Sequence, residues 1–168
     1  MSEQLQNEDV KLTEARSLAF MLAGNATVTL RSVRTGTRYT FKIQKAKPSK
    51  DPLKPKQPDT WFVNLLTGPN NEADYRYMGM IRNGVFNVAF TYKDRNSGLR
   101  KPTGFTVTTP SVVAFMWTLR KLNEAATNFG VEIFHSGTCG RCGRKLTVPE
   151  SIETGLGPEC AEKGFGGF

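Results

Sequence analysis

The chain has 168 residues, of which 38% are hydrophobic and 10% are aromatic. This is enough for one domain of ordinary size with a hydrophobic core and a small additional module, so we expect a folded, soluble protein. Lysines and arginines outnumber acidic residues by 23 to 15, and the pI of about 9.6 favours polyanionic partners over acidic small-molecule substrates.

No apolar run approaches the length of a membrane span. The N-terminal sequence MSEQLQNEDV is polar and acidic, unlike a signal peptide. We therefore expect a cytoplasmic protein that does not enter a membrane.

The N-terminal part of the chain predicts a tail followed by one helix. Residues 1–12 have no hydrophobic period, which is typical of a flexible tail. The sequence TEARSLAFMLAG, from Thr13, has apolar residues at helical spacing and ends at Gly24. It predicts a short helix.

A hairpin is predicted next, from ATVTLRSV and RYTFKIQK joined by RTGT. Apolar and polar residues alternate in both segments, so Val28 and Leu30 should face inward opposite Tyr39, Phe41 and Ile43, with the other face in solvent. Residues 45–59 then contain four prolines and no apolar period, which predicts an extended basic loop, here called the lysine loop.

Further strands are predicted from WFVNLLTG and from DYRYMGMIRNGVFNVAFTYK. The second sequence should form a hairpin, because Asn83 and Gly84 suit a two-residue turn with two positive φ angles. DRNSGLRKPTG predicts a second basic loop, and GFTVTT predicts one more strand.

The main helix is predicted from Ser111 to Phe129, after Pro110 and before Gly130. Core packing is the favoured interpretation of Trp117 and of the methionine and aromatic stripe, although a binding surface is the alternative. The stripe that should cover the sheet is Val112, Phe115, Met116, Leu119 and Leu122.

A possible metal site lies in HSGTCGRCGRKLTVPESIETGLGPEC, which holds the only histidine and all three cysteines of the chain. A CxxC pair lets two thiolates reach one ion from a tight turn, and further ligands complete the tetrahedron that zinc prefers. The predicted ligands are His135, Cys139, Cys142 and Cys160. Because four protein ligands leave no position for water, we expect a structural zinc ion.

Alternatives to this zinc site stay open. The cysteines could be buried hydrophobic residues or could form disulfides, although their odd number and the CxxC spacing favour a reducing compartment. His135, which ends the alternating sequence VEIFH, could be a surface residue. In that case an acidic side chain or a water molecule would complete the zinc site.

The same segment resembles a small zinc module at the C-terminus of uncharacterised phage and bacterial proteins. A weaker likeness to phage proteins of similar size extends upstream through LAGNATVTL and WFVNLLTGPNNEADY. The resemblance implies a bound zinc ion and a phage or bacterial setting, but no reaction; we expect a phage-encoded protein in the cytoplasm of a bacterial host cell. The matching residues are Cys139, Cys142, Gly143, Arg144, Leu146, Pro149, Ser151, Gly155, Gly157, Pro158 and Cys160.

Together, these elements predict an α+β fold. An antiparallel sheet of about five strands should be packed by the long helix and by the short N-terminal helix, within a domain spanning residues 13–134. Residues 135–168 should form a zinc-knuckle or treble-clef-like module docked on that domain, since VEIF leads directly into it.

Four basic segments are candidates for binding a nucleic acid or another partner. In a simple meander, the turns at 34–37 and 94–101 lie at one end of the sheet, so their cations should form one patch that neutralises phosphates. Tyr75, Tyr77 and Tyr92 could stack on unpaired bases; the alternative is that the loops are basic only for solubility. The candidate residues are Arg34, Arg38, Lys47, Lys50, Lys54, Lys56, Arg95, Arg100, Lys101, Arg141, Arg144 and Lys145.

Two functions fit these features. The first is a non-enzymatic, zinc-stabilised protein that binds DNA or RNA, in which the arginines of the knuckle bind phosphate. The second is a phage inhibitor that binds a host protein or ribonucleoprotein complex, such as an anti-CRISPR-like or other anti-defence factor. An enzyme is disfavoured, because zinc takes the only histidine and the carboxylates Glu72, Asp74, Asp94 and Glu124 are scattered.

Overall fold

The computed structural model describes residues 10–48, 50–55, 58–68 and 74–135. These residues form an α+β fold with two helices, a seven-stranded sheet and a separate two-stranded sheet. The elements in chain order are β1 (Val10–Leu12), α2 (Glu14–Met21), β2 (Asn25–Ser32), β3 (Arg38–Lys45), β4 (Thr60–Leu66), β5 (Tyr75–Arg82), β6 (Val85–Val88), β7 (Thr91–Lys93), β8 (Arg100–Pro102), α3 (Pro110–Asn123) and β9 (Val131–His135).

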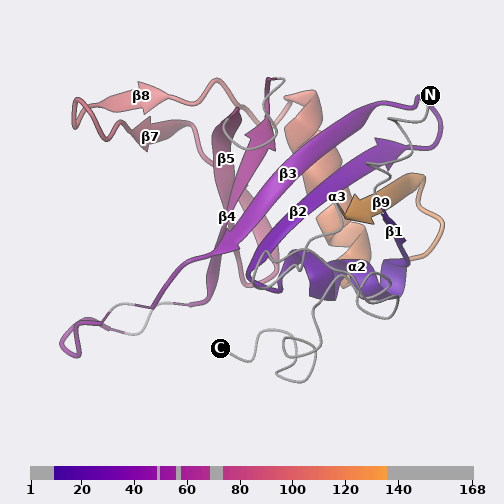
Figure 1. Ribbon diagram of the computed structural model, residues 1–168, viewed down its shortest axis with the longest axis horizontal. Coiled ribbons are helices and arrows are strands. Elements are labelled where there is room, and N and C mark those ends of the chain that lie inside the picture. Colours follow the sequence, from indigo (N-terminus) through magenta and orange to yellow (C-terminus); the bar gives the residue numbers. More distant parts are fainter. Residues whose placement is uncertain (1–9, 49, 56–57, 69–73, 136–168) are drawn as a thin grey trace.

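The large sheet has the strand order β1-β9-β2-β3-β4-β5-β6, and its neighbouring strands are antiparallel (Figure 1). Strands β2 to β6 form the predicted meander, in which consecutive strands are neighbours. Strand β9 comes last along the chain but lies between β1 and β2. The chain therefore returns from α3 to the beginning of the sheet before it enters the predicted zinc module.

The two predicted hairpins are confirmed. Val28 lies opposite Phe41 and Leu30 opposite Tyr39, as the alternation of apolar residues predicts. Asn83 and Gly84 have φ angles of 53° and 75°, the two positive values that a type I′ turn requires.

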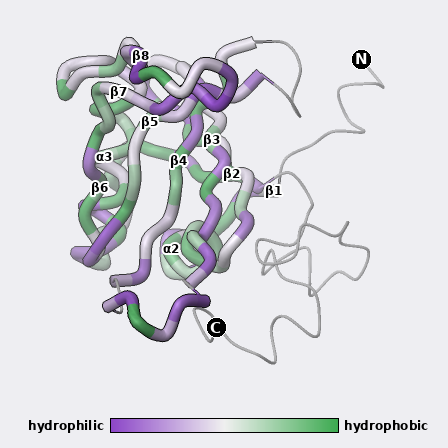
Figure 2. Tube along the Cα trace, turned by 90° about the vertical axis from the view of Figure 1, so that its left-hand side faces the viewer, coloured by the Kyte–Doolittle hydropathy of each residue, from purple (hydrophilic) through white to green (hydrophobic). Residues whose placement is uncertain are grey.

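The hydrophobic core lies between one face of the sheet and the two helices. Phe115 of α3 is at its centre, with ring centroids 4.8 Å from Phe41 and 5.0 Å from Phe86. Phe20 of α2 is fully buried in the same core. In the side view of Figure 2, α3 and the strands β2 and β3 lie on opposite sides of β4. The contact between Phe41 and Phe115 shows that α3 covers the face of the sheet that carries Phe41, and we call it the covered face.

Two predictions for the strands need correction. The predicted number of about five strands is too low, because β1 and β9 extend the large sheet and β7 and β8 form a second one. Val10–Leu12 belong to β1, so the predicted flexible tail does not include them; residues 1–9 lie outside the described residues. A pairing partner as distant as β9 cannot be recognised from the local period of a three-residue strand.

The chain between β6 and α3 also differs from the prediction. Strand β6 ends at Val88, and Thr91–Lys93 pair with Arg100–Pro102 as a projecting hairpin. The predicted strand GFTVTT is wrong: the Thr106 amide donates to Thr109 Oγ1 at 2.9 Å, which turns the chain into α3. Threonine side chains that bond to nearby backbone amides favour such turns over extended structure.

Helix α3 begins at Pro110, one residue before the predicted start at Ser111, and ends at Asn123, six residues before Phe129. The helix terminates because Ala125 adopts a φ of 54°, and the Ala126 amide donates back to the Lys121 carbonyl at 2.9 Å. This is the geometry of a Schellman motif, in which glycine is the usual left-handed residue. Within the described ranges, no helix is both long and apolar enough to cross a bilayer.

Candidate nucleic-acid interface

The face of the sheet opposite the helices, here called the open face, carries a mixture of aromatic, polar and cationic side chains. Residues that lie directly opposite one another on neighbouring strands project to the same side. The register thus places Thr27, Lys42, Asn64 and Tyr77 in one row across β2 to β5. Phe62 lies in the next row, paired with Gln44 on one side and Met80 on the other.

On this face the rings of Phe62 and Tyr77 are close to each other, and the ring of Tyr75 is close to a cation. The rings of Phe62 and Tyr77 are 6.2 Å apart in an edge-to-face arrangement, and Phe62 is 39% exposed. Lys42 Nζ lies 5.6 Å from the centroid of the Tyr75 ring. Such contacts allow a surface to offer ring faces and positive charge together.

The two tyrosines on this face stay neutral at physiological pH. Partial burial raises the pKa of Tyr75 above its usual value. Burial also raises the pKa of Tyr77, an effect that the nearby charge of Arg82 partly opposes. Both hydroxyl groups therefore remain hydrogen-bond donors and do not repel a phosphate.

The charge of the open face differs between its two sides. On the side of β9, Glu132 accepts a hydrogen bond from Arg31 at 2.8 Å and pairs with Lys11 at 3.1 Å. These contacts lower the pKa of Glu132, and the contact with Lys11 contributes most. In contrast, the outward residues of β3 to β5, all of which are described, include Arg38, Lys42 and Arg82 but no carboxylate. The positive potential is therefore strongest over β3 to β5.

The β7–β8 hairpin, residues 91–102, forms a basic arm whose turn is built around Asp94. The Asp94 carboxylate accepts hydrogen bonds from the Asn96 amide at 3.2 Å and from Ser97 Oγ at 3.0 Å, and lies 2.7 Å from Lys101 Nζ. These bonds lower the pKa of Asp94 to about 2, and the bond from Lys101 contributes most. The contact between Lys101 and Asp94 also raises the pKa of Lys101.

Lys101 is therefore partly neutralised within the hairpin arm. Its position opposite Tyr92 shows that this tyrosine belongs to the arm and not to the open face, unlike Tyr75 and Tyr77. The predicted cations Arg95 and Arg100 are exposed, as is Lys93. Lys101 is exposed as well, although its charge is paired with that of Asp94.

The second basic arm is the lysine loop, which begins after Lys45. Lys47, Lys50 and Lys54 are exposed; Lys56 lies outside the described residues. At the base of the loop, Lys45 Nζ lies 3.7 Å from Asp59 Oδ2 and 5.4 Å from the centroid of the Trp61 ring. These contacts fix the point where the loop joins β4.

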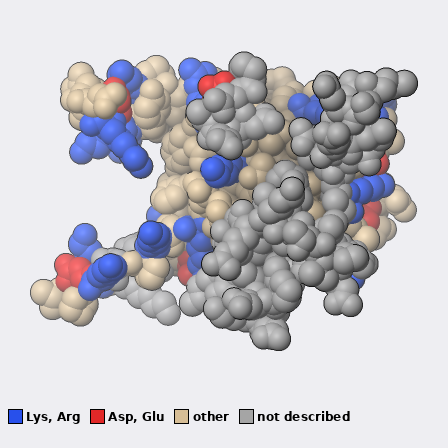
Figure 3. Space-filling view, in the orientation of Figure 1, with Lys and Arg blue, Asp and Glu red and all other residues tan. Residues whose placement is uncertain are grey.

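The two arms extend from the same side of the molecule, on the left in Figure 1. In the space-filling view, blue side chains on the hairpin arm and on the lysine loop face each other across a hollow (Figure 3). The lysine loop leads into Thr60 of β4, and the hairpin arm follows β6. Strands β4 to β6 thus connect the bases of the two arms.

The structure does not form the single patch predicted from Arg34, Arg38 and the 94–101 turn. The 33–37 turn lies on the right of Figure 1 and the hairpin arm on the far left. Both leave the same end of the strands, as a meander requires. However, β2 and β6 are four intervals apart, which is about 19 Å, and twist rotates them by about 80–100°. Arg38 instead lies 5.9 Å from the centroid of the Phe134 ring.

His135 is the last residue of β9 and is fully buried. It lies opposite Val28 in the register, and its ring centroid is 5.3 Å from that of Phe20. The interpretation of His135 as a surface residue is therefore wrong.

The remaining predicted zinc ligands, Cys139, Cys142 and Cys160, lie outside the described residues, as do Arg141, Arg144 and Lys145. Among the residues that the structure does describe, no three His, Cys, Asp or Glu side chains gather in a way that could hold a metal ion. The zinc site therefore stays a prediction.

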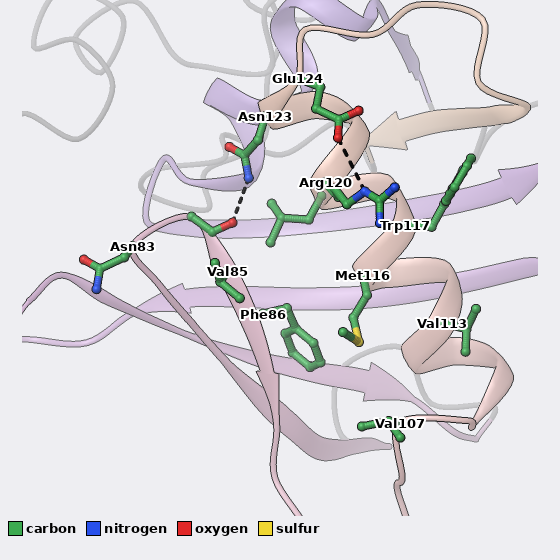
Figure 4. Close-up of a pocket in the computed structure, with 12 residues that line it drawn as sticks. Asn83, Val85, Phe86, Val107, Val113, Met116, Trp117, Arg120, Asn123 and Glu124 are labelled. Atoms are coloured by element: carbon green, nitrogen blue, oxygen red, sulfur yellow. Dashed lines mark hydrogen bonds and ion pairs between the residues drawn. The ribbon is translucent and has the colours of Figure 1, made fainter.

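A groove of 690 Å³ lies between α3 and β6, away from the open face (Figure 4). Its apolar lining includes Val85, Met116 and Trp117, which are 58%, 38% and 42% exposed. Core packing was the favoured interpretation of Met116 and Trp117, and their exposure corrects it. At one end of the groove, Asn123 Nδ2 donates to the Gly84 carbonyl at 2.7 Å.

Sequence reasoning missed Phe62, Lys42 and Arg82 as site residues. Lys42 and Arg82 lie within strands, where charge was interpreted as the ordinary solvent side of an alternating pattern. Phe62 follows Trp61 and precedes Val63, so the sequence WFV has apolar residues on both faces of β4. A strand with an apolar residue on its solvent side was the available signal.

A family model described as "Family of unknown function (DUF6011)" matches residues 132–163. The match begins within β9 and contains His135 and the three cysteines, so this part of the chain is similar to an uncharacterised family. It leaves most of the α+β domain unmatched. No curated protein and no solved structure shows a significant match to the chain.

Proposed function

We propose that the chain is a non-enzymatic, zinc-stabilised nucleic-acid-binding protein encoded by a phage. The observation that carries this proposal is the pair of basic arms, whose cations border one hollow on the same side of the molecule (Figure 3). A strand of nucleic acid has regularly spaced phosphates, and two facing rows of lysines and arginines match that charge. Neutralising phosphates releases counterions, so binding should weaken steeply with salt.

The zinc ion would be held by His135, Cys139, Cys142 and Cys160. Support comes from the burial of His135 at the end of β9 and from the family match over all four residues. A structural ion there would fix the cations Arg141, Arg144 and Lys145 relative to the sheet. Mass spectrometry of the purified chain should find one zinc per chain, and His135→Ala should lower that content; a metal-free chain that folds fully would contradict the zinc part of the proposal.

The nucleic-acid part is tested by fluorescence anisotropy with labelled oligonucleotides between about 50 and 200 mM salt. One variant replaces Lys47, Lys50 and Lys54 with glutamine, and another replaces Arg95 and Arg100. Each should weaken binding and reduce the slope of log K against log salt by about 0.7 per lost contact to a single strand.

Arg34→Gln is the matched control for these arm variants. Arg34 is an exposed arginine of the 33–37 turn, a segment that lies on the right of Figure 1, away from the two arms, so its removal changes the net charge without changing either arm. Binding should stay close to that of the unchanged protein. An equal loss in the control and arm variants, or an affinity independent of salt, would contradict the role of the arms.

A second candidate function is supported by the groove between α3 and β6. Exposed apolar side chains favour a protein partner over a nucleic acid, and β6 is the edge strand of the large sheet. An extended segment of a host protein could pair with β6 and place apolar side chains against Trp117. A host partner that survives nuclease treatment, but is lost with Trp117→Ala, would favour this function.

A further inference from the structure

We propose that the open face of β3 to β5 binds unpaired bases, so the preferred ligand is a single strand of nucleic acid. This inference rests on the proposed nucleic-acid-binding function and names its substrate class. The surface consists of Phe62, Tyr75 and Tyr77 with the cations Lys42 and Arg82. It is distinct from the two arms, which contact the backbone only.

The aromatic rings of Phe62 and Tyr77 lie where an unpaired base can reach them. Phe62 is 39% exposed although it lies in the middle of a seven-stranded sheet, where its strand neighbours Trp61 and Val63 are buried. Its ring and that of Tyr77 meet edge to face at 6.2 Å. In such a pair, the ring that offers its edge keeps its own two faces clear of the partner, and a base can stack there.

The three rings follow one another along strands β4 and β5. Phe62 is near the end of β4 that the lysine loop enters, and Tyr77 and Tyr75 follow toward the other end of β5. Tyr75 and Tyr77 are two residues apart on one strand and so are separated by about 7 Å. A single strand that runs along β4 and β5 would therefore meet three rings in succession.

The charge of the open face over β3 to β5 is complementary to that of a nucleic acid. The outward residues of β3 to β5 include three cations and no carboxylate, and the tyrosine hydroxyls are uncharged at physiological pH. Lys42 Nζ lies over one face of the Tyr75 ring, 5.6 Å from its centroid, and so brings a cation among the rings, where it can neutralise a phosphate. Arg82 is held at the base of the lysine loop, where its Nε donates to Thr60 Oγ1 at 2.9 Å.

These features select a single strand over a duplex. The bases of a duplex stack on each other and pair edge to edge, so a protein ring cannot reach their faces without unpairing them. Unpaired bases are free to stack on protein rings, and every base has a face that can do so. The expected binding is therefore specific for single strands but tolerant of sequence.

The test uses the full chain and three labelled probes of about 20 nucleotides: single-stranded DNA, single-stranded RNA and duplex DNA. The single strands should bind at least about tenfold more tightly than the duplex. Phe62→Leu and Tyr77→Leu keep an apolar side chain but remove the ring face, and each should weaken single-strand binding by about five- to 150-fold. Duplex binding should change much less.

Trp117→Leu is the matched control, because Trp117 is 42% exposed but lies in the groove between α3 and β6. It should leave single-strand affinity within about twofold. Circular dichroism melting of each variant confirms that it is folded. If Phe62→Leu proves unfolded, Tyr77→Leu together with Lys42→Gln provides the same comparison.

Two outcomes would overturn the inference while leaving the proposed function in place. One is equal affinity for duplex and single strands, and the other is full single-strand affinity in the folded Phe62 and Tyr77 variants. If none of the three probes binds at low salt, both the proposed function and this inference fail.

Discussion

The two faces of the large sheet are made by the same strands but have different roles. On the covered face, Phe41 and its neighbours are fully buried against α2 and α3. On the open face, Phe62 remains 39% exposed beside Tyr77. The alternation of side chains along a strand thus separates residues that stabilise the fold from residues that are available to a ligand.

Because the two faces carry different residues, stability and binding can be changed independently in this protein. A substitution on the covered face alters packing throughout the core, because protein interiors are closely packed. A substitution on the open face alters mainly what solvent and ligands contact. Pairs of similar residues, one from each face, therefore provide the sharpest experiments.

The largest expected effect comes from comparing Phe115→Ala with Phe62→Ala. Phe115 is fully buried between Phe41 and Phe86, so its truncation should lower the free energy of unfolding by about 3–5 kcal/mol. Phe62→Ala should cost no more than about 1 kcal/mol. Urea denaturation measures both. Equal losses would mean that the two faces do not differ as described.

A smaller loss of stability is expected from Gly79→Ala, on the covered face of β5. A Cβ atom there would lie 2.2 Å from the Asn87 carbonyl oxygen and 2.7 Å from the Phe86 ring. Because the backbone of β6 must move, we expect a loss of about 1–3 kcal/mol. Thermal unfolding followed by circular dichroism measures this, and an unchanged melting temperature would show that β5 and β6 are less closely paired than described.

A gain in stability of about 1 kcal/mol is expected from Ala125→Gly, at the end of α3. Ala125 has a φ of 54°, a left-handed conformation that glycine adopts without steric cost. The melting temperature should rise by about 2–4 °C. Ala126→Gly is the matched control and should give no gain, since φ is not positive at Ala126. Nucleic-acid affinity should be unaffected by either change.

The smallest expected effect concerns Asp94, which lies on neither face. Its pKa in the folded protein is about 2, below the ordinary value of 3.8, so its contribution to stability is present above pH 4 and disappears as the pH falls toward 2. Carboxyl NMR should place its titration midpoint near the lower value, and Lys101→Gln should raise it. A midpoint near 3.8 in the unchanged protein would contradict the hydrogen bonds of the hairpin arm.

The sequence alone predicted the parts of the fold that depend on local signals. Alternating residues predicted the β2–β3 hairpin, and Asn83 and Gly84 predicted the next one. The end of α3 was missed because alanine occupies the position that glycine usually takes. The insertion of β9 between β1 and β2 was missed because it depends on contacts between distant segments, which leave no local pattern.

The candidate site was predicted only in part. Clusters of lysine and arginine identified both basic arms, but twist separates the 33–37 turn from the hairpin arm. Tyr75 and Tyr77 were named as possible stacking residues, whereas Phe62 was assigned to a strand without a role. Its exposure depends on which face the helices cover, and periodicity within one strand does not determine that.

The most direct test of the account is to map where a bound single strand contacts the protein. The full chain, mixed with an oligothymidine, is irradiated with ultraviolet light, digested and analysed by mass spectrometry for peptides that carry a nucleotide. We predict crosslinks at Phe62 on β4 and at Tyr75 or Tyr77 on β5. Crosslinks confined to the groove between α3 and β6, with none on β4 or β5, would contradict the account.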